Sequence, residues 1–177
     1  NPKLTENFLR FILNGAILFR KNNKVKIKKL KNTEEFFISN ITNLLEEHFC
    51  AKYETHGGSK LPVLAFYAIY QILVSEMDRY RDCELAPLGS HTASDRTSKS
   101  AGDIEIMKDN NVYEAVEVKL DKPVNITMVR IANEKIIKFN PERYYIFSNI
   151  GITEEDKKEI EELINEIKEK HGCQLII

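Results

Sequence analysis

Cysteine is scarce in this chain, and the cysteines it has are far apart. The 177 residues contain three of them, Cys50, Cys83 and Cys173. An odd, dispersed set argues against a disulfide framework and against a zinc site, because both need cysteines at characteristic spacings. We therefore expect reduced thiols that pack inside a cytoplasmic protein.

Long apolar runs are also missing. The most apolar stretch, residues 61–74, is interrupted by Tyr and Gln and is too short to span a bilayer, so we expect no membrane partner. The first residues do not resemble the basic and then hydrophobic leader of an exported protein. The Asn at position 1 is consistent with an upstream segment, and the bare apolar end at Ile177 suggests that the natural protein continues.

Net charge is small, −1 at pH 7, which argues against a highly basic nucleic-acid binder. The charges are nevertheless unevenly placed. Seven basic residues and no acid lie between positions 20 and 31, whereas eight acids and four lysines lie between positions 154 and 170. A chain divided in this way can hold DNA along its basic edge. A lysine-rich strand or loop exposed to water explains the basic run equally well.

The chain otherwise has the composition of an ordinary folded protein, with 42% hydrophobic and 30% charged residues. We predict one domain over residues 1–177, in which residues 1–60 form a helical and basic extension and residues 61–177 form an α/β (α+β) core. Apolar spacing predicts helices at 4–19, 33–49, 61–80, 126–139 and 153–170, and strands at 103–107, 112–120, 143–148 and 173–177.

The first two strands are expected to pair as a β-hairpin around the turn residues 109–111. With a three-residue loop, positions that face each other sum to 220, which places Asp103 opposite Glu117. Alternation of side chains then gathers four polar residues on one face and four apolar residues on the other. The polar set is Asp103, Glu105, Glu117 and Lys119, and the apolar set is Ile104, Ile106, Val116 and Val118.

Two opposed carboxylates beside a lysine predict a site for a divalent cation. Directly opposed residues have Cβ atoms about 4.5–5.5 Å apart, where like charges destabilise a sheet. Magnesium would offset that repulsion, because it prefers hard oxygen ligands and completes its shell with water and substrate phosphate. Lys119 shares the face of Glu117, within reach of an attacking water or a scissile phosphate. These residues outline a site for metal-assisted phosphodiester hydrolysis.

The pattern acid-x-Lys occurs four times, but only Glu117-Val118-Lys119 lies in an apolar, alternating strand. With Gly102-Asp103 before it and helix, strand, helix and strand after it, this motif resembles that of the PD-(D/E)xK nuclease superfamily. The resemblance covers about residues 61–177. Residues 88–96 and 115–119 further look like those of a type II restriction endonuclease. Gly102 stands where the nominal family pattern has Pro.

The resemblance implies a restriction-endonuclease-like core, with helices flanking a central mixed four-stranded sheet, and Mg²⁺-dependent cleavage of double-stranded DNA at a specific sequence. It also implies that Asp103 and Glu117 bind the metal, that the Val118 carbonyl adds a ligand, and that Lys119 orients or deprotonates the attacking water. By analogy, we expect a homodimer that cuts both strands.

Family members often add an acid from the first core helix. Glu76 is the candidate here, with Glu46 or Glu47 as alternates, although an acid near a helix end is commonly just solvated. Glu105 either supports the metal ligands or is an exposed strand residue.

Polar loops supply candidate DNA contacts. His91, Arg96 and Lys99 lie in the loop that leads into the first predicted strand, where they either touch phosphates or base edges or are simply solvated. Lys60 follows a Gly-Gly turn that can approach a DNA backbone closely, and an ordinary helix-entry loop fits that segment as well.

Two pairs later in the chain are interpreted conservatively. Lys135 and Lys138 could meet phosphate, but a solvated helix face is the favoured interpretation. Tyr144 and Tyr145 are expected to pack in the sheet rather than to stack on bases.

Other functions remain open beside the restriction enzyme. A nuclease for DNA repair or junction cleavage can use the same fold. A catalytically silent DNA-binding or assembly module would be expected to have lost an acid or the lysine, and here all three residues are present. In an unrelated α/β interaction domain, Asp103 and Glu117 would not converge in the structure.

Overall fold

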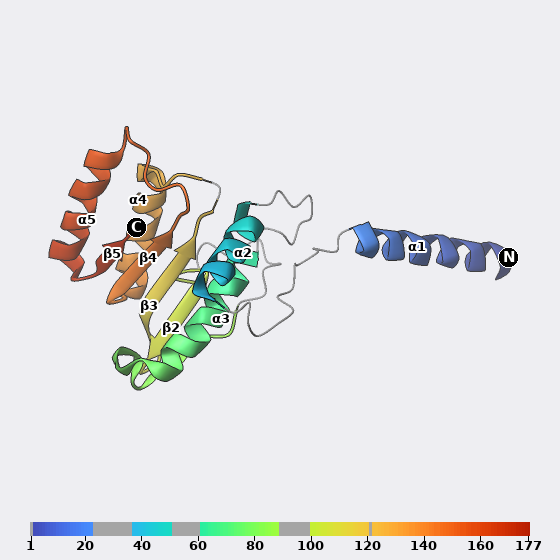
Figure 1. The fold of residues 1–177 in the computed structure, drawn as a ribbon, viewed down its shortest axis with the longest axis horizontal. Coiled ribbons are helices and arrows are strands. Elements are labelled where there is room, and N and C mark those ends of the chain that lie inside the picture. The colour runs from blue at the N-terminus through green and yellow to red at the C-terminus, as the bar shows by residue number, and fades with distance from the viewer. Residues whose placement is uncertain (1, 23–36, 51–60, 89–99, 121) are drawn as a thin grey trace. The chain divides into compact units, whose positions relative to one another are not determined.

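The computed structural model describes residues 2–22, 37–50, 61–88, 100–120 and 122–177 (Figure 1). The chain divides into two compact units, Asn1–Leu61 and Pro62–Ile177. The first unit contains α1 (Pro2–Asn22) and α2 (Ile38–Cys50), which confirms the helix expected at 4–19 and most of that expected at 33–49. The lysine-rich run beyond Asn22 lies outside the described residues. No helix in the described parts of the chain has the length and apolarity needed to cross a bilayer.

The second unit is built on one mixed sheet of five strands in the order β1-β2-β3-β4-β5. The pairs β1–β2 and β2–β3 are antiparallel, whereas β3–β4 and β4–β5 are parallel. Its elements are α3 (Leu61–Glu76), a 3₁₀-helix (Asp78–Tyr80), β1 (Cys83–Leu85), β2 (Ile104–Lys108), β3 (Asn111–Val118), α4 (Ile126–Phe139), β4 (Arg143–Phe147), α5 (Lys157–His171) and β5 (Gln174–Ile176).

The predicted class, a mixed sheet flanked by helices, is confirmed, but two details of the prediction were wrong. The sheet has five strands rather than four, because the short β1 adds to the edge of β2. The helix expected to run to Tyr80 ends at Glu76, because the backbone of Met77 is extended, with φ −97° and ψ 127°. A separate turn of 3₁₀-helix then follows.

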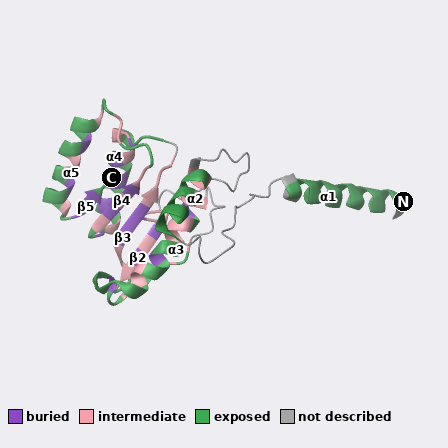
Figure 2. Cartoon of the chain, in the orientation of Figure 1, coloured by how far each residue is buried: buried purple, intermediate pink, exposed green. Residues whose placement is uncertain are grey.

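An apolar core covers each face of the sheet (Figures 1 and 2). Buried residues of α3, among them Val63 and Tyr70, pack on the face that carries Ile104, Ile106 and Val116, which confirms the predicted apolar face. The opposite face, which carries Ala115, Tyr144 and Ile146, is covered by α4 and α5 through Val129, Ala132, Ile136, Ile160 and Ile167. The polar residues predicted for that face therefore lie at the margin of a second core.

The β2–β3 hairpin keeps the predicted register, although its loop is shorter than expected. Ile104 pairs with Val116 and Ile106 with Glu114, whereas Lys108 pairs with Asn111, so only Asp109 and Asn110 form the loop. Both have positive φ, 51° and 63°, as a two-residue type I′ turn requires. A bulge between Ile106 and Met107 absorbs the one-residue difference.

Glu114 places a fully buried carboxylate on the α3 face of β3. Its Oε1 accepts hydrogen bonds from the hydroxyls of Tyr70, at 3.0 Å, and Tyr80, at 2.8 Å. Its Oε2 pairs with the guanidinium of Arg79 at 2.8 Å. Because a buried charge is costly unless it is paired and hydrogen-bonded, this cluster joins α3 and the 3₁₀-helix to the sheet.

The first prediction concerns this cluster. Glu114→Ala should lower the free energy of unfolding by about 3 kcal/mol, because two hydroxyls and a guanidinium lose their buried acceptor. Urea denaturation measures the change. Glu84→Ala, at an exposed position of β1, is the matched control and should change stability by less than about 0.5 kcal/mol. Equal effects in the two variants would contradict the structural role of Glu114.

Candidate functional site

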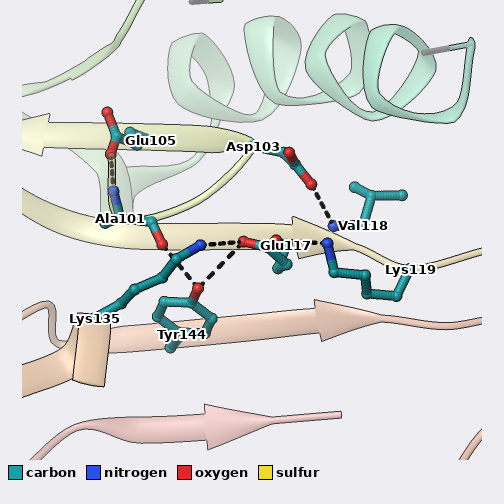
Figure 3. Close-up of polar contacts among 8 residues, drawn as sticks. All are labelled: Ala101, Asp103, Glu105, Glu117, Val118, Lys119, Lys135 and Tyr144. Atoms are coloured by element: carbon teal, nitrogen blue, oxygen red, sulfur yellow. Dashed lines mark hydrogen bonds and ion pairs between the residues drawn. The ribbon is translucent and has the colours of Figure 1, made fainter. Parts of the chain in front are cut away.

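Asp103 precedes β2 and is bound to β3 by both its backbone and its side chain, and Figure 3 shows the side-chain bond. Its N–H donates to the carbonyl of Val116 at 2.8 Å, and its Oδ2 accepts from the N–H of Val118 at 2.9 Å. The carboxylate thus substitutes for a backbone partner of Val118. It is thereby held where β2 begins and β3 ends.

Gly102 allows this close approach. A Cβ at this position would lie 2.6 Å from the carbonyl oxygen of Val116 and 3.0 Å from its carbonyl carbon and its nitrogen. All three are backbone atoms in the centre of the sheet, which cannot move aside easily. Proline also carries a Cβ, so the departure from the nominal family pattern at Gly102 has a steric reason.

Ala101, the residue before Gly102, is held through both its N–H and its carbonyl group. The N–H of Ala101 donates to Oε1 of Glu105, and the hydroxyl of Tyr144 donates to the carbonyl of Ala101 at 2.8 Å (Figure 3). Glu105 is partly buried rather than exposed. It therefore contacts the backbone that leads into Asp103, and the alternative of an exposed strand residue is wrong.

Glu117 lies among three polar partners from three elements. Its Oε1 pairs with Nζ of Lys119, just after β3, at 2.6 Å, and its Oε2 pairs with Nζ of Lys135, from α4, at 2.8 Å. The hydroxyl hydrogen of Tyr144 in β4, which is donated mainly to the carbonyl of Ala101, is shared more weakly with the same Oε2, 3.3 Å away. The side chain of Glu117 is 16% exposed, that of Lys135 14% and that of Lys119 34%, so Lys119 is the more accessible of the two lysines.

Burial and charge shift the two acids in opposite directions. Burial raises the pKa of Asp103, the negative charge of Glu117 raises it further, and the lowering contributions of the Val118 N–H and the two lysines do not cancel this. Burial alone would raise the pKa of Glu117, but the ammonium groups of Lys135 and Lys119 outweigh it and hold that pKa below its ordinary value. The structure therefore brings Asp103 and Glu117 within electrostatic reach of each other.

Two members of this cluster were not anticipated as such from the sequence. Lys135 was interpreted as solvated, yet it follows Ala132 by three residues and adjoins Ile136, both buried, so helical spacing already placed it beside the apolar stripe of α4. Tyr144 packs in the core as predicted, but its hydroxyl also binds Glu117. Burial, and then the Glu117 charge, raise the pKa of this phenol, which stays protonated and donates.

The structure does not bring the predicted third acid to Asp103 and Glu117. Glu76 is the last residue of α3 and is exposed, because the chain leaves the helix there. No cluster of three or more His, Cys, Asp or Glu side chains suited to a metal occurs in the described ranges. The predicted DNA-contacting residues Lys60, His91, Arg96 and Lys99 lie outside the described residues.

The second prediction tests the close approach at Gly102. Gly102→Ala should destabilise the protein by about 1–3 kcal/mol, because the added methyl overlaps the Val116 backbone. Urea denaturation measures the change. Gly15→Ala, in a helix with nothing within 4 Å of the added Cβ, serves as control and should not destabilise. Unchanged stability in Gly102→Ala would contradict the steric argument.

The third prediction follows from the raised pKa of Asp103. A carboxyl whose folded-state pKa exceeds its unfolded value contributes stability below the unfolded pKa, and that contribution is lost as pH rises through the folded pKa. At pH 7, Asp103→Asn should therefore raise the melting temperature of the metal-free protein, since Asn can still accept from Val118. A gain of about 1 kcal/mol corresponds to roughly 2–4 °C.

The pH dependence checks the cause of that gain. It should disappear near about pH 3, where both side chains are uncharged. Asp78→Asn, at a carboxylate that is 92% exposed, should change little at either pH. A lower melting temperature for Asp103→Asn at pH 7, or a gain that persists in acid, would show that the ionised carboxylate is not the source of strain.

Comparison with known proteins adds a family to this geometry. A family model described as the SacI restriction endonuclease C-terminal domain matches residues 37–148, which is more than half of the chain and includes Asp103, Glu117, Lys119 and Lys135. No curated protein matches the chain. The resemblance to type II restriction endonucleases is thereby confirmed: the chain belongs to the family of the SacI restriction endonuclease C-terminal domain and is a type II restriction endonuclease-like protein.

Proposed function

We propose that this protein is a Mg²⁺-dependent endodeoxyribonuclease that hydrolyses phosphodiester bonds in duplex DNA at a specific sequence. The observation that carries the proposal is the convergence of Asp103 and Glu117 on neighbouring strands with Lys119 beside them. Membership of a restriction endonuclease family supports DNA as the substrate. Sequence specificity and magnesium dependence are the parts that experiment must test.

The residues present fit a small, hard cation. Asp103 and Glu117 would contribute carboxylate oxygens, which are the ligands that magnesium prefers. The carbonyl of Val118 is suited to add a third oxygen, because the N–H and C=O of one strand residue point to the same side, and the Val118 N–H points at Asp103. Magnesium held there would supply charge compensation and Lewis-acid polarisation of the scissile phosphate.

Lys119 is the residue we propose to act on the attacking water. Its ammonium is bound to Glu117 and is partly exposed, so it can meet both the metal ligands and an incoming phosphate. In the hydrolysis, the water oxygen bonds to phosphorus as the bond to the leaving sugar oxygen breaks. One proton leaves the water and one reaches the leaving oxygen, and Lys119 orients or deprotonates the water in that exchange.

The DNA-binding surface and the assembly are further parts of the proposal. The basic residues between positions 20 and 31 and the candidates Lys60, His91, Arg96 and Lys99 would contact the DNA. A homodimer would place two such sites on the two strands of a duplex. We also expect the enzyme to act in the cytoplasm, where chromosomal and incoming DNA are both present.

The fourth prediction is a cleavage assay on plasmid DNA with Mg²⁺. Asp103→Ala and Lys119→Ala should each lower the rate by at least about 100-fold, as expected when one charged group of a preorganised site is removed. Glu166→Ala and Lys168→Ala are the matched controls, because they alter the same acid-x-Lys pattern on the exposed face of α5, and both should cut normally.

The products identify the kind of nuclease. Discrete fragments indicate a restriction enzyme, whereas nicks confined to branched substrates would favour repair or junction cleavage on the same fold. Activity that survives both Asp103→Ala and Lys119→Ala would refute the site. Intact plasmid in all reactions, at any Mg²⁺ concentration, would instead support a silent DNA-binding module.

A further inference from the structure

The site holds one lysine more than the acid-x-Lys motif requires. Lys135 reaches Glu117 from α4, on the carboxylate oxygen that Lys119 leaves open. At 14% exposure it is more buried than Lys119. Burial of an ammonium is costly, and a buried ion pair is commonly no more stable than apolar residues in the places of both partners. Packing alone therefore does not explain a lysine at this position of α4.

The charges of the four ionisable side chains balance without a metal. Asp103 and Glu117 contribute two negative charges, and Lys119 and Lys135 contribute two positive ones. A divalent cation bound to the two acids leaves a net charge of +2. A phosphodiester attacked by hydroxide carries −2, so the loaded site matches the charge that develops during hydrolysis, and each ammonium has an anionic partner in both states.

We propose that Lys135 is a second phosphate-binding cation of the active site, paired with Glu117 in the metal-free protein and with a phosphate oxygen of bound DNA when the metal is present. This inference rests on the proposed nuclease function. In the metal-free state Lys135 holds Glu117 and competes with the metal for it. In the loaded state it stabilises negative charge on the phosphate, which makes it a catalytic residue in addition to Lys119.

The variant Lys135→Met tests this, because it keeps most of the length of the side chain and removes the charge. Calorimetric titration with Mg²⁺ alone should show severalfold tighter binding than in the parent protein, since one competing cation has gone. Plasmid cleavage at saturating Mg²⁺ should nevertheless fall by about 100-fold or more in kcat. Lys138→Met removes an exposed charge from the same helix and should change neither quantity.

A role limited to positioning Glu117 predicts a different pattern. Lys135→Met would then bind Mg²⁺ more weakly and would recover its cleavage rate at high Mg²⁺, and that result overturns the proposal. Cleavage by Lys135→Met at the wild-type rate at saturating Mg²⁺ also overturns the proposal for Lys135. The proposed nuclease function still stands in that case, provided that Asp103→Ala loses activity. If the parent protein does not cut at all, the proposed nuclease function fails. Separately, unchanged or weaker Mg²⁺ binding in Lys135→Met would refute the competition between Lys135 and the metal for Glu117.

Folding is controlled in the same experiment. Thermal melting of Lys135→Met should show a folded protein at the assay temperature. Lys135→Gln replaces it if it does not, because Gln retains a hydrogen-bond donor for Glu117 without the charge. The same two outcomes, tighter Mg²⁺ binding and slower cleavage, are expected of that variant, whereas Lys135→Arg should retain cleavage.

Discussion

The burial of two carboxylates, Asp103 and Glu117, is the main constraint at the end of the β2–β3 hairpin. Burial disfavours the ionised form of both Asp103 and Glu117, and the negative charge of Glu117 raises the pKa of Asp103 further. The fold accommodates them by placing an ammonium on each oxygen of Glu117 and a backbone N–H on Asp103. Gly102 allows the backbone approach that precedes Asp103, and α4 brings Lys135 to Glu117.

The mixed character of the sheet explains how so many groups reach one point. Its antiparallel half brings Asp103 beside β3 by a short hairpin. Its parallel half requires a crossover, and that crossover is α4, which carries Lys135 over the same face that Tyr144 reaches from β4. A purely antiparallel sheet could supply the two acids, but the second lysine depends on the helix that a parallel connection needs.

The sequence predicted the features that depend on neighbouring residues of the chain, and it did not predict those that depend on contacts between distant elements. The pairing of Ile104 with Val116 follows from local alternation and was correct, as was the apolar face of Ile104. The pairing of Asp103 with Glu117 stays a prediction, because the Asp103 N–H bonds to Val116. The partners of Glu114, and the approach of Lys135 to Glu117, depend on how elements pack and leave no periodic signal in a single strand. Strand β1 escaped notice because three residues are too few to show alternation. The candidate DNA contacts in the polar loops stay predictions.

The bulge in the hairpin has a consequence for the spacing of the two acids. A ladder continued from the two-residue turn without an extra residue would pair Ile104 with Ala115 instead of Val116, and Glu117 would then emerge on the side of Ile104, within the core beneath α3. The extra residue of the bulge shifts the alternation of side chains by one position, so that Asp103 and Glu117 lie on the same side of the sheet. The number of residues between Asp103 and Glu117 is therefore constrained, because adding or removing one would move one of the two acids to the other face of the sheet.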